Sequence, residues 1–208
     1  MYKPIQIGKI KTSSLELTDI VKAWLAISFA FAVVLGGFSL SSGRVYGIFS
    51  LTFLQFFLMA LLTAGLGFLL HELAHKFVAQ RYGCVAEFRA FDQMIYLAVG
   101  LALLVGFIFA APGAVMIHGM ITRRENGLIS AAGPLTNYVL GLVFLGLSSI
   151  VASPLLTKSF LVGFQINMWL GLFNMIPFGN FDGIKIFHWN ITFWTGMAAF
   201  GIFFVFFF

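Results

Sequence analysis

A histidine, a glutamate and a second histidine form one short motif, H-E-x-x-H, at His71, Glu72 and His75. Residues four apart lie on one face of an α-helix, so both imidazoles can reach a single metal ion. Zinc binds histidine nitrogen readily, and a catalytic zinc keeps one position open for a water whose pKa it lowers. Glu72 can take the proton of that water. The spacing is typical of zinc metalloproteases and predicts metal-assisted hydrolysis.

A zinc site normally has a third protein ligand, and the sequence offers few candidates. Asp182 stands in a segment interrupted by Pro177 and Gly183, between two apolar stretches. A carboxylate in such surroundings needs a partner, and a metal ion is an obvious one. Asp182 is therefore the predicted third ligand, and His118 and His188 are the alternatives.

The elements that must position these residues are membrane helices by composition. Of the 208 residues, 61% are hydrophobic and only 9% are charged, whereas a soluble domain has about 25% charged residues. Uncharged stretches such as Ala23–Gly43, Val45–Leu70 and Asn126–Thr157 can hold the roughly 18–20 apolar residues of a membrane span. We expect an all-α polytopic membrane protein of one domain (1–208), with about five to six transmembrane helices and a short membrane-associated β-type segment. Buried histidine and glutamate are costly in a membrane and usually functional, which disfavours two ordinary core histidines.

The distribution of charge predicts orientation. The net charge is +5, and the polar segment 1–22 carries four lysines, which places it in the cytoplasm by the positive-inside rule. We therefore expect a multi-pass protein of the cell membrane with a cytoplasmic N-terminus and a retained first span. The sequence shows no basic patch on a soluble surface, so it gives no support to nucleic-acid binding.

Local signals predict where the elements begin and end. A weakly alternating stretch at Ile5–Ile10 predicts a short strand, and the pattern S-x-x-E at Ser13–Glu16 predicts the start of the first helix. The motif helix is expected over 49–82, with Gly83 as its C-cap. A short β-type segment is expected at Ala111–Gly119. The later spans are expected at about 131–153 with Pro134 in the first turn, at 160–174 and at 186–208.

Two further motifs make the chain resemble the site-2 proteases, which are membrane-embedded zinc metalloproteases. That family has H-E-x-x-H in one span and N-x-x-P-x-x-x-x-D-G in a later one. Here the second motif reads Asn174-Met175-Ile176-Pro177 and then Asp182-Gly183, and the A-G-P-L-T-N segment at 132–137 looks like the family's A-G-P-L segment. The resemblance covers a catalytic core of about 49–183.

The resemblance implies a fold, a site and an activity. By resemblance, His71, His75 and Asp182 bind one zinc ion per chain and Glu72 activates the water. Asn174 is expected near the metal, where it helps to bind or polarise the scissile carbonyl. The activity implied is hydrolysis of a peptide bond in or near a transmembrane segment of another membrane protein. The expected partners are that substrate and the lipid bilayer.

The chain departs from the family pattern at Gln93–Ala111, where about 20 extra apolar residues precede the A-G-P segment. If this stretch returns to the side from which it started, the motif helix and Asp182 approach the metal from the same face. If it crosses, they approach from opposite faces and can share one zinc only near mid-membrane. We therefore favour a re-entrant or hairpin segment over a full span.

Two other function classes fit part of the pattern. A metal-ion transporter or sensor could use His71, His75 and Asp182 as a binding site, because transport sites favour broken helices. It would not require Glu72, which a protease needs as a base. An inactive scaffold would not require the complete set of four residues.

Overall fold

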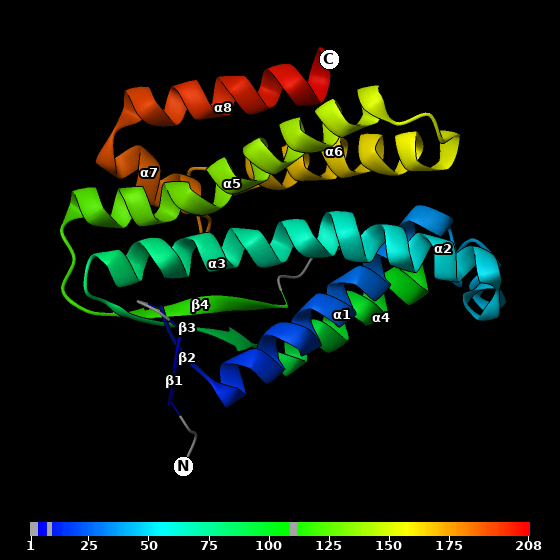
Figure 1. Cartoon of the computed structure of the whole chain (residues 1–208), viewed down its shortest axis with the longest axis horizontal. Helices are drawn as coiled ribbons and strands as arrows, with labels where there is room; N and C mark the ends of the chain where they lie inside the picture. Colours follow the sequence, from blue (N-terminus) through cyan, green and yellow to red (C-terminus); the bar gives the residue numbers. More distant parts are fainter. Residues whose placement is uncertain (1–3, 8–9, 109–111) are drawn as a thin grey trace. The chain divides into compact units, whose positions relative to one another are not determined.

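The computed structural model describes residues 4–7, 10–108 and 112–208 (Figure 1). The chain divides into two compact units. Unit 1 comprises Met1–Leu66 and Glu87–Ala114, and unit 2 comprises Gly67–Ala86 and Val115–Phe208. The expectation of a single domain stays a prediction, and each unit is described by itself.

Unit 1 begins with a small hairpin and the first long helix. Strands β1 (Pro4–Ile7) and β2 (Ile10–Ser13) pair in antiparallel register, with Ile5 opposite Thr12. Helix α1 (Ser14–Gly36) starts where the sequence predicted, because the Ser13 side chain accepts a hydrogen bond from the Glu16 N–H. It ends at Gly37, whose φ of +66° is the left-handed conformation that favours glycine.

The motif helix is continuous from Leu51 to Arg81 and contains one irregular turn. A short 3₁₀ segment, η1 (Val45–Phe49), leads into α2 (Leu51–Ala60). A π-type turn, η2 (Leu61–Gly65), then leads into α3 (Leu66–Arg81), which carries the motif. Gly83 follows with a φ of +80°, which confirms the predicted C-cap.

The extra apolar segment forms a short helix whose flanking residues meet. Helix α4 (Asp92–Val105) packs along α1 in unit 1. Its 14 residues extend for about 21 Å, less than the roughly 30 Å of a bilayer core. The Phe91 N–H, just before α4, donates to the Pro112 carbonyl at 2.9 Å. The chain therefore returns to the level from which it left, which favours the re-entrant interpretation.

A second two-stranded sheet follows the motif helix. Strand β3 (Val85–Ala90) pairs with β4 (Gly113–His118). The expected β-type segment at Ala111–Gly119 is therefore confirmed over Gly113–His118, while Ala111 lies outside the described residues.

Unit 2 completes the fold with four helices: α5 (Arg123–Ile150), α6 (Pro154–Asn174), α7 (Asp182–Trp189) and α8 (Ile191–Phe206). Helix α5 packs along α6 and α7, and α8 packs on α6 and α7 (Figure 1). Side chains from these helices, among them Tyr138, Phe164 and Met168, form the core of unit 2. The loop between α6 and α7 confirms the predicted break before Asp182.

Three predicted helix boundaries are wrong. Helix α6 starts at Pro154 instead of about 160, with the proline in its first turn. Helix α5 starts at Arg123 instead of about 131, because Thr122 and Glu125 form a reciprocal capping box. Pro134 therefore lies inside the helix instead of in its first turn. The expected final span 186–208 is two helices, since Asn190 ends α7 and its side chain caps α8 by accepting from the Phe193 N–H.

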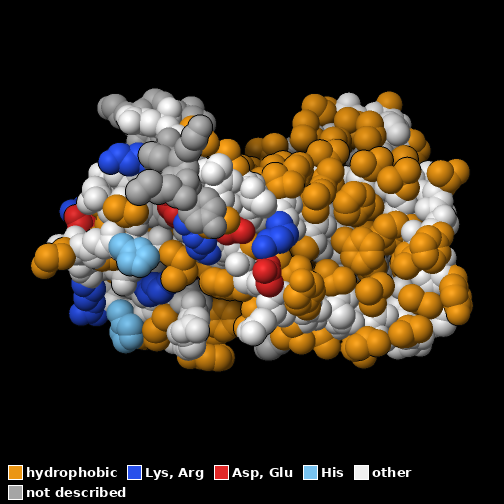
Figure 2. Space-filling model, turned by 90° about the horizontal axis from the view of Figure 1, so that it is seen from below, with side chains coloured by type: hydrophobic (Ala, Val, Ile, Leu, Met, Phe, Trp, Pro, Cys, Tyr) orange, Lys and Arg blue, Asp and Glu red, His pale blue; other side chains and the backbone are white. Residues whose placement is uncertain are grey.

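The described helices are those of a membrane protein. Three are long and apolar enough to cross a bilayer: Ser14–Gly36, Leu51–Arg81 and Arg123–Ile150. The helices Asp92–Val105 and Ile191–Phe206 are apolar but shorter. Hydrophobic side chains cover much of one face, while charged side chains gather on one part of it (Figure 2). The helical membrane class is confirmed, and the number of five to six spans stays a prediction.

Candidate metal centre

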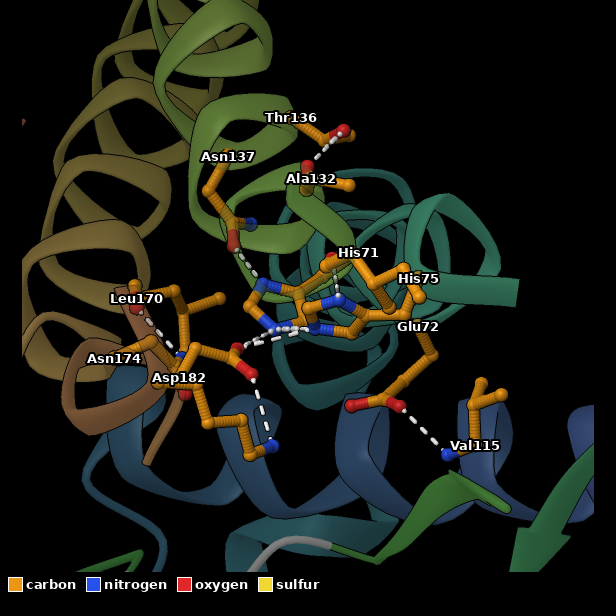
Figure 3. A network of polar contacts seen from close by, with 12 residues as sticks. His71, Glu72, His75, Val115, Ala132, Thr136, Asn137, Leu170, Asn174 and Asp182 are labelled. Atoms are coloured by element: carbon orange, nitrogen blue, oxygen red, sulfur yellow. Dashed lines mark hydrogen bonds and ion pairs between the residues drawn. The ribbon is translucent and has the colours of Figure 1, made fainter. Parts of the chain in front are cut away.

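Three buried side chains of unit 2 converge on one point (Figure 3). The Nε2 atoms of His71 and His75 lie 3.0 Å apart. Asp182 Oδ2 lies 3.3 Å from the first nitrogen and 3.1 Å from the second. One turn of α3 supplies the two histidines, and the first residue of α7 supplies the aspartate. These are the three residues that the sequence predicted to share a metal ion.

The outer nitrogen of each imidazole bonds to an oxygen. His75 Nδ1 lies 2.8 Å from the Ile129 carbonyl, which can only accept, so the proton sits on Nδ1. His71 Nδ1 lies 2.6 Å from Asn137 Oδ1. The Asn137 NH₂ group donates to the Gly67 carbonyl, so its oxygen faces the imidazole and accepts from Nδ1. Both Nε2 atoms therefore present lone pairs to the shared point.

The donor set fits a zinc ion. Two imidazole lone pairs and a carboxylate oxygen face one another, and a cation between them would relieve their mutual repulsion. Zinc bonds of about 2.0–2.2 Å to each would separate tetrahedral ligands by about 3.3 Å, close to the spacing here. Gly133 of α5 leaves this point open. A Cβ added there would lie 2.5 Å from His71 Nε2 and closer still to His75 Nε2.

Glu72 lies beside this point and is held by β4. Its Oε2 accepts a hydrogen bond from the Val115 N–H at 3.0 Å (Figure 3). The group of potential metal ligands found among the described residues contains His71, His75 and Asp182 but not Glu72. The carboxylate is thus placed as a neighbour of the metal point, which suits a base better than a ligand.

Known proteins resemble this chain in sequence. Over 185 residues, 88% of either chain, it is 40% identical to a protein of Methanocaldococcus jannaschii named "putative zinc metalloprotease". The chain belongs to the site-2 protease family of zinc metalloproteases. It is accordingly a zinc-dependent protease.

More distant relatives of this site-2 protease share the metalloprotease name. A zinc metalloprotease of M. jannaschii is 28% identical over 161 residues, which are 75% of this chain and 38% of that protein. A Bacillus subtilis protein, also named "putative zinc metalloprotease", is 30% identical over 143 residues, 60% of this chain and 65% of that one. A solved site-2 protease of M. jannaschii aligns with 96% of this chain and 78% of its own, at 21% identity and a TM-score of 0.43. No protein-family model matches the chain.

Asp182 of this site-2 protease owes its position to a tight loop. Gly183 packs against the backbone of Met175 and Ile176, where a Cβ would meet the Ile176 carbonyl oxygen at 2.6 Å. Asp182 can therefore head α7 close to the end of α6. The alternatives for the third ligand, His118 and His188, are both exposed, and neither belongs to the converging group.

Asn174 is the last residue of α6. Its Nδ2 donates to the Leu170 carbonyl at 2.9 Å, within its own helix (Figure 3). That bond leaves the amide oxygen to face elsewhere. The role expected for Asn174 at the scissile carbonyl stays a prediction.

Several residues near the site had no predicted role. Gly133 and Asn137 belong to the A-G-P-L-T-N segment. That segment carried the family resemblance, but it did not predict that these two residues contact the site. Asn167 of α6 bonds to Asn137 at 3.0 Å, and Lys185 Nζ lies 3.6 Å from Asp182 Oδ1. The sequence held a weak signal for Asn167, since an amide in an apolar helix needs a partner.

Proposed function

We propose that this protein is an intramembrane zinc endopeptidase, which hydrolyses a peptide bond in or near a transmembrane segment of another membrane protein. The observation that carries the proposal is the convergence of His71, His75 and Asp182, with Glu72 beside them, in a protein of apolar helices. A buried site on membrane helices suits substrates that are themselves membrane segments. One zinc ion per chain is the proposed complement.

The side chains of the site have two separate roles, metal binding and proton transfer. His71, His75 and Asp182 would hold the zinc ion, which when bound lowers the pKa of water and polarises a carbonyl group. Glu72 takes a proton from the attacking water and passes it to the leaving amine nitrogen as the C–N bond breaks. The Val115 N–H keeps the Glu72 carboxylate aimed beside the metal point. Buried surroundings limit competing access of solvent.

The substrate must be locally extended, because a helix ties up its own carbonyls in hydrogen bonds. Strand β4 belongs to a two-stranded sheet and passes next to Glu72 through Val115. An extended substrate segment could add to the edge of this strand and gain main-chain hydrogen bonds. This arrangement would bring the scissile bond beside the base.

The orientation of the protein forms part of the proposal. The Lys-rich N-terminal segment would be cytoplasmic in a multi-pass protein of the cell membrane. The hydrogen bond between Phe91 and Pro112 supports a re-entrant 93–111 segment. Arg123 and Lys185 would then lie on the same, cytoplasmic side as the N-terminus.

The test is cleavage of model single-span substrates by the purified protein in vesicles. Cleavage should stop when a chelator is added, return with zinc, and be absent from His71→Ala. Mass spectrometry of the products would place the cut in or near the apolar segment. A different result would contradict the proposal: if no substrate is cleaved, but zinc crosses the vesicle membrane and this depends on His71, the protein is a transporter.

A further inference from the structure

Two fully buried asparagines form a chain of hydrogen bonds that ends at His71. Asn167 Nδ2 donates to the Gly163 carbonyl at 2.8 Å, and Asn167 Oδ1 accepts from Asn137 Nδ2 at 3.0 Å. The Asn137 NH₂ group also donates to the Gly67 carbonyl at 3.2 Å, and its Oδ1 accepts from His71 Nδ1 at 2.6 Å. The chain connects α6 to α5 and α5 to α3.

Two backbone carbonyls set the direction of every bond in this chain, because a carbonyl can only accept. The Gly163 carbonyl requires the NH₂ group of Asn167, whose oxygen must then face Asn137. That oxygen and the Gly67 carbonyl together require the NH₂ group of Asn137, whose oxygen must then face His71. His71 consequently donates from Nδ1 and keeps the lone pair of Nε2 for the metal site.

A reversed Asn137 amide would have the opposite effect on His71. Its NH₂ group would face Nδ1 and favour the tautomer that carries the proton on Nε2, which cannot bind a metal. The reversed oxygen would also face two acceptors, the Gly67 carbonyl and Asn167 Oδ1. Removing Asn167 leaves only one of these acceptors, so the free-energy cost of the reversed orientation falls.

The close approach of α6 to α3 depends on Gly67. A Cβ at this position would collide with Asn167 Oδ1 and would lie 3.0 Å from Asn167 Cγ. Glycine in a helix costs about 1 kcal/mol relative to alanine, so its presence here needs a local reason. Access of the Asn167 amide to the hydrogen-bond chain supplies one.

We propose that Asn167 is a positioning residue, which acts through Asn137 to hold His71 in its metal-binding tautomer. The inference rests on the proposed zinc site but concerns zinc affinity, which is measured without any substrate. Partners beyond the direct ligands typically change metal affinity 10- to 100-fold. We therefore expect Asn167→Leu to weaken zinc binding about 10-fold or more.

The experiment is competition for zinc between a chromophoric chelator and the purified full-length chain. Gln165→Leu is the matched control, since it also removes an amide from α6 but at an exposed position. It should bind zinc like the parent chain. Gly67→Ala displaces Asn167 without altering any amide, and we expect a similar loss of affinity although alanine favours the helix.

A double variant separates orientation from general packing. In Asn137→Asp, both carboxylate oxygens accept, so nothing needs to orient the group that faces His71. Adding Asn167→Leu to this variant should leave zinc affinity unchanged or improve it, because it removes an acceptor that faces the carboxylate. An equal loss in both backgrounds would mean that Asn167 only fills space.

The outcomes distinguish the two proposals. A parent chain that binds no zinc would overturn the proposed function. A parent chain that binds zinc, with Asn167→Leu and Gly67→Ala binding it equally tightly, would overturn the positioning role alone.

Discussion

Gly133 gives the sharpest single perturbation of the metal centre. A methyl group at this position would lie 2.5 Å from His71 Nε2 and 2.6 Å from His71 Cε1, whereas ordinary Cβ contacts begin at about 3.4 Å. Because His75 Nε2 would lie as close, both imidazole rings must move away by about 0.9 Å or more. Zinc–ligand distances tolerate only about ±0.2 Å, so Gly133→Ala should break at least one zinc bond.

We expect Gly133→Ala to lower zinc affinity by about 100-fold or more, comparable with the effect that a misplacement of about 1 Å has on catalysis. The stability of helix α5 itself should not fall, because alanine is favoured over glycine in a helix by about 1 kcal/mol. Zinc per chain, measured by mass spectrometry after dialysis, together with thermal unfolding in detergent, separates these two effects.

Gly146→Ala is the matched control. It makes the same substitution in α5, at a position where an added Cβ has open space around it. This variant should retain both zinc and cleavage. If Gly133→Ala binds zinc as tightly as Gly146→Ala, the metal does not lie where His71, His75 and Asp182 converge.

Three further predictions test the site, the core and the topology. Asp182→Ala should lose most of its zinc, because only two of the three protein ligands remain. Unchanged zinc content would remove Asp182 from the ligand set. Tyr138→Phe should leave thermal stability unchanged or raise the unfolding midpoint by a few degrees, because the Tyr138 hydroxyl is buried without a hydrogen-bond partner among the described residues. A clear loss of stability would reveal a partner for it. In a Cys84→Ser background, Asn126→Cys should be labelled from the cytoplasmic side, and labelling only from outside would make 93–111 a true span.

The local parts of the site could be predicted from the sequence. His71 and His75 share a face because helical spacing alone places them there, and Asp182 stood out because a lone carboxylate between apolar stretches needs a partner. Gly83 and Ser13 carried strong cap signals, and both helix ends lie where these predicted. Each of these inferences depends on residues close together along the chain.

The errors and omissions have identifiable physical causes. Pro134 suggested a helix start at about 131 because proline fits a first turn, but the capping box at Thr122 and Glu125 starts α5 at Arg123. Proline inside a membrane helix is tolerated when neighbouring groups satisfy the freed backbone. Asn167 and Gly133 escaped notice because their contacts with the site come from packing between helices, and no local pattern reports such contacts.

Glu72 is the proposed base of this zinc protease, and Glu72→Gln removes that function while changing little else. Glutamine keeps the size of the side chain and can still accept from the Val115 N–H, but it cannot take a proton from water. The measurement is the rate of cleavage of a single-span substrate by Glu72→Gln protein that has been shown to hold as much zinc as the parent chain. We expect cleavage to fall by about 100-fold or more, because general acid–base catalysis contributes about 10²–10⁴-fold. Cleavage at the parent rate by zinc-loaded Glu72→Gln would contradict the assignment of Glu72 as the base.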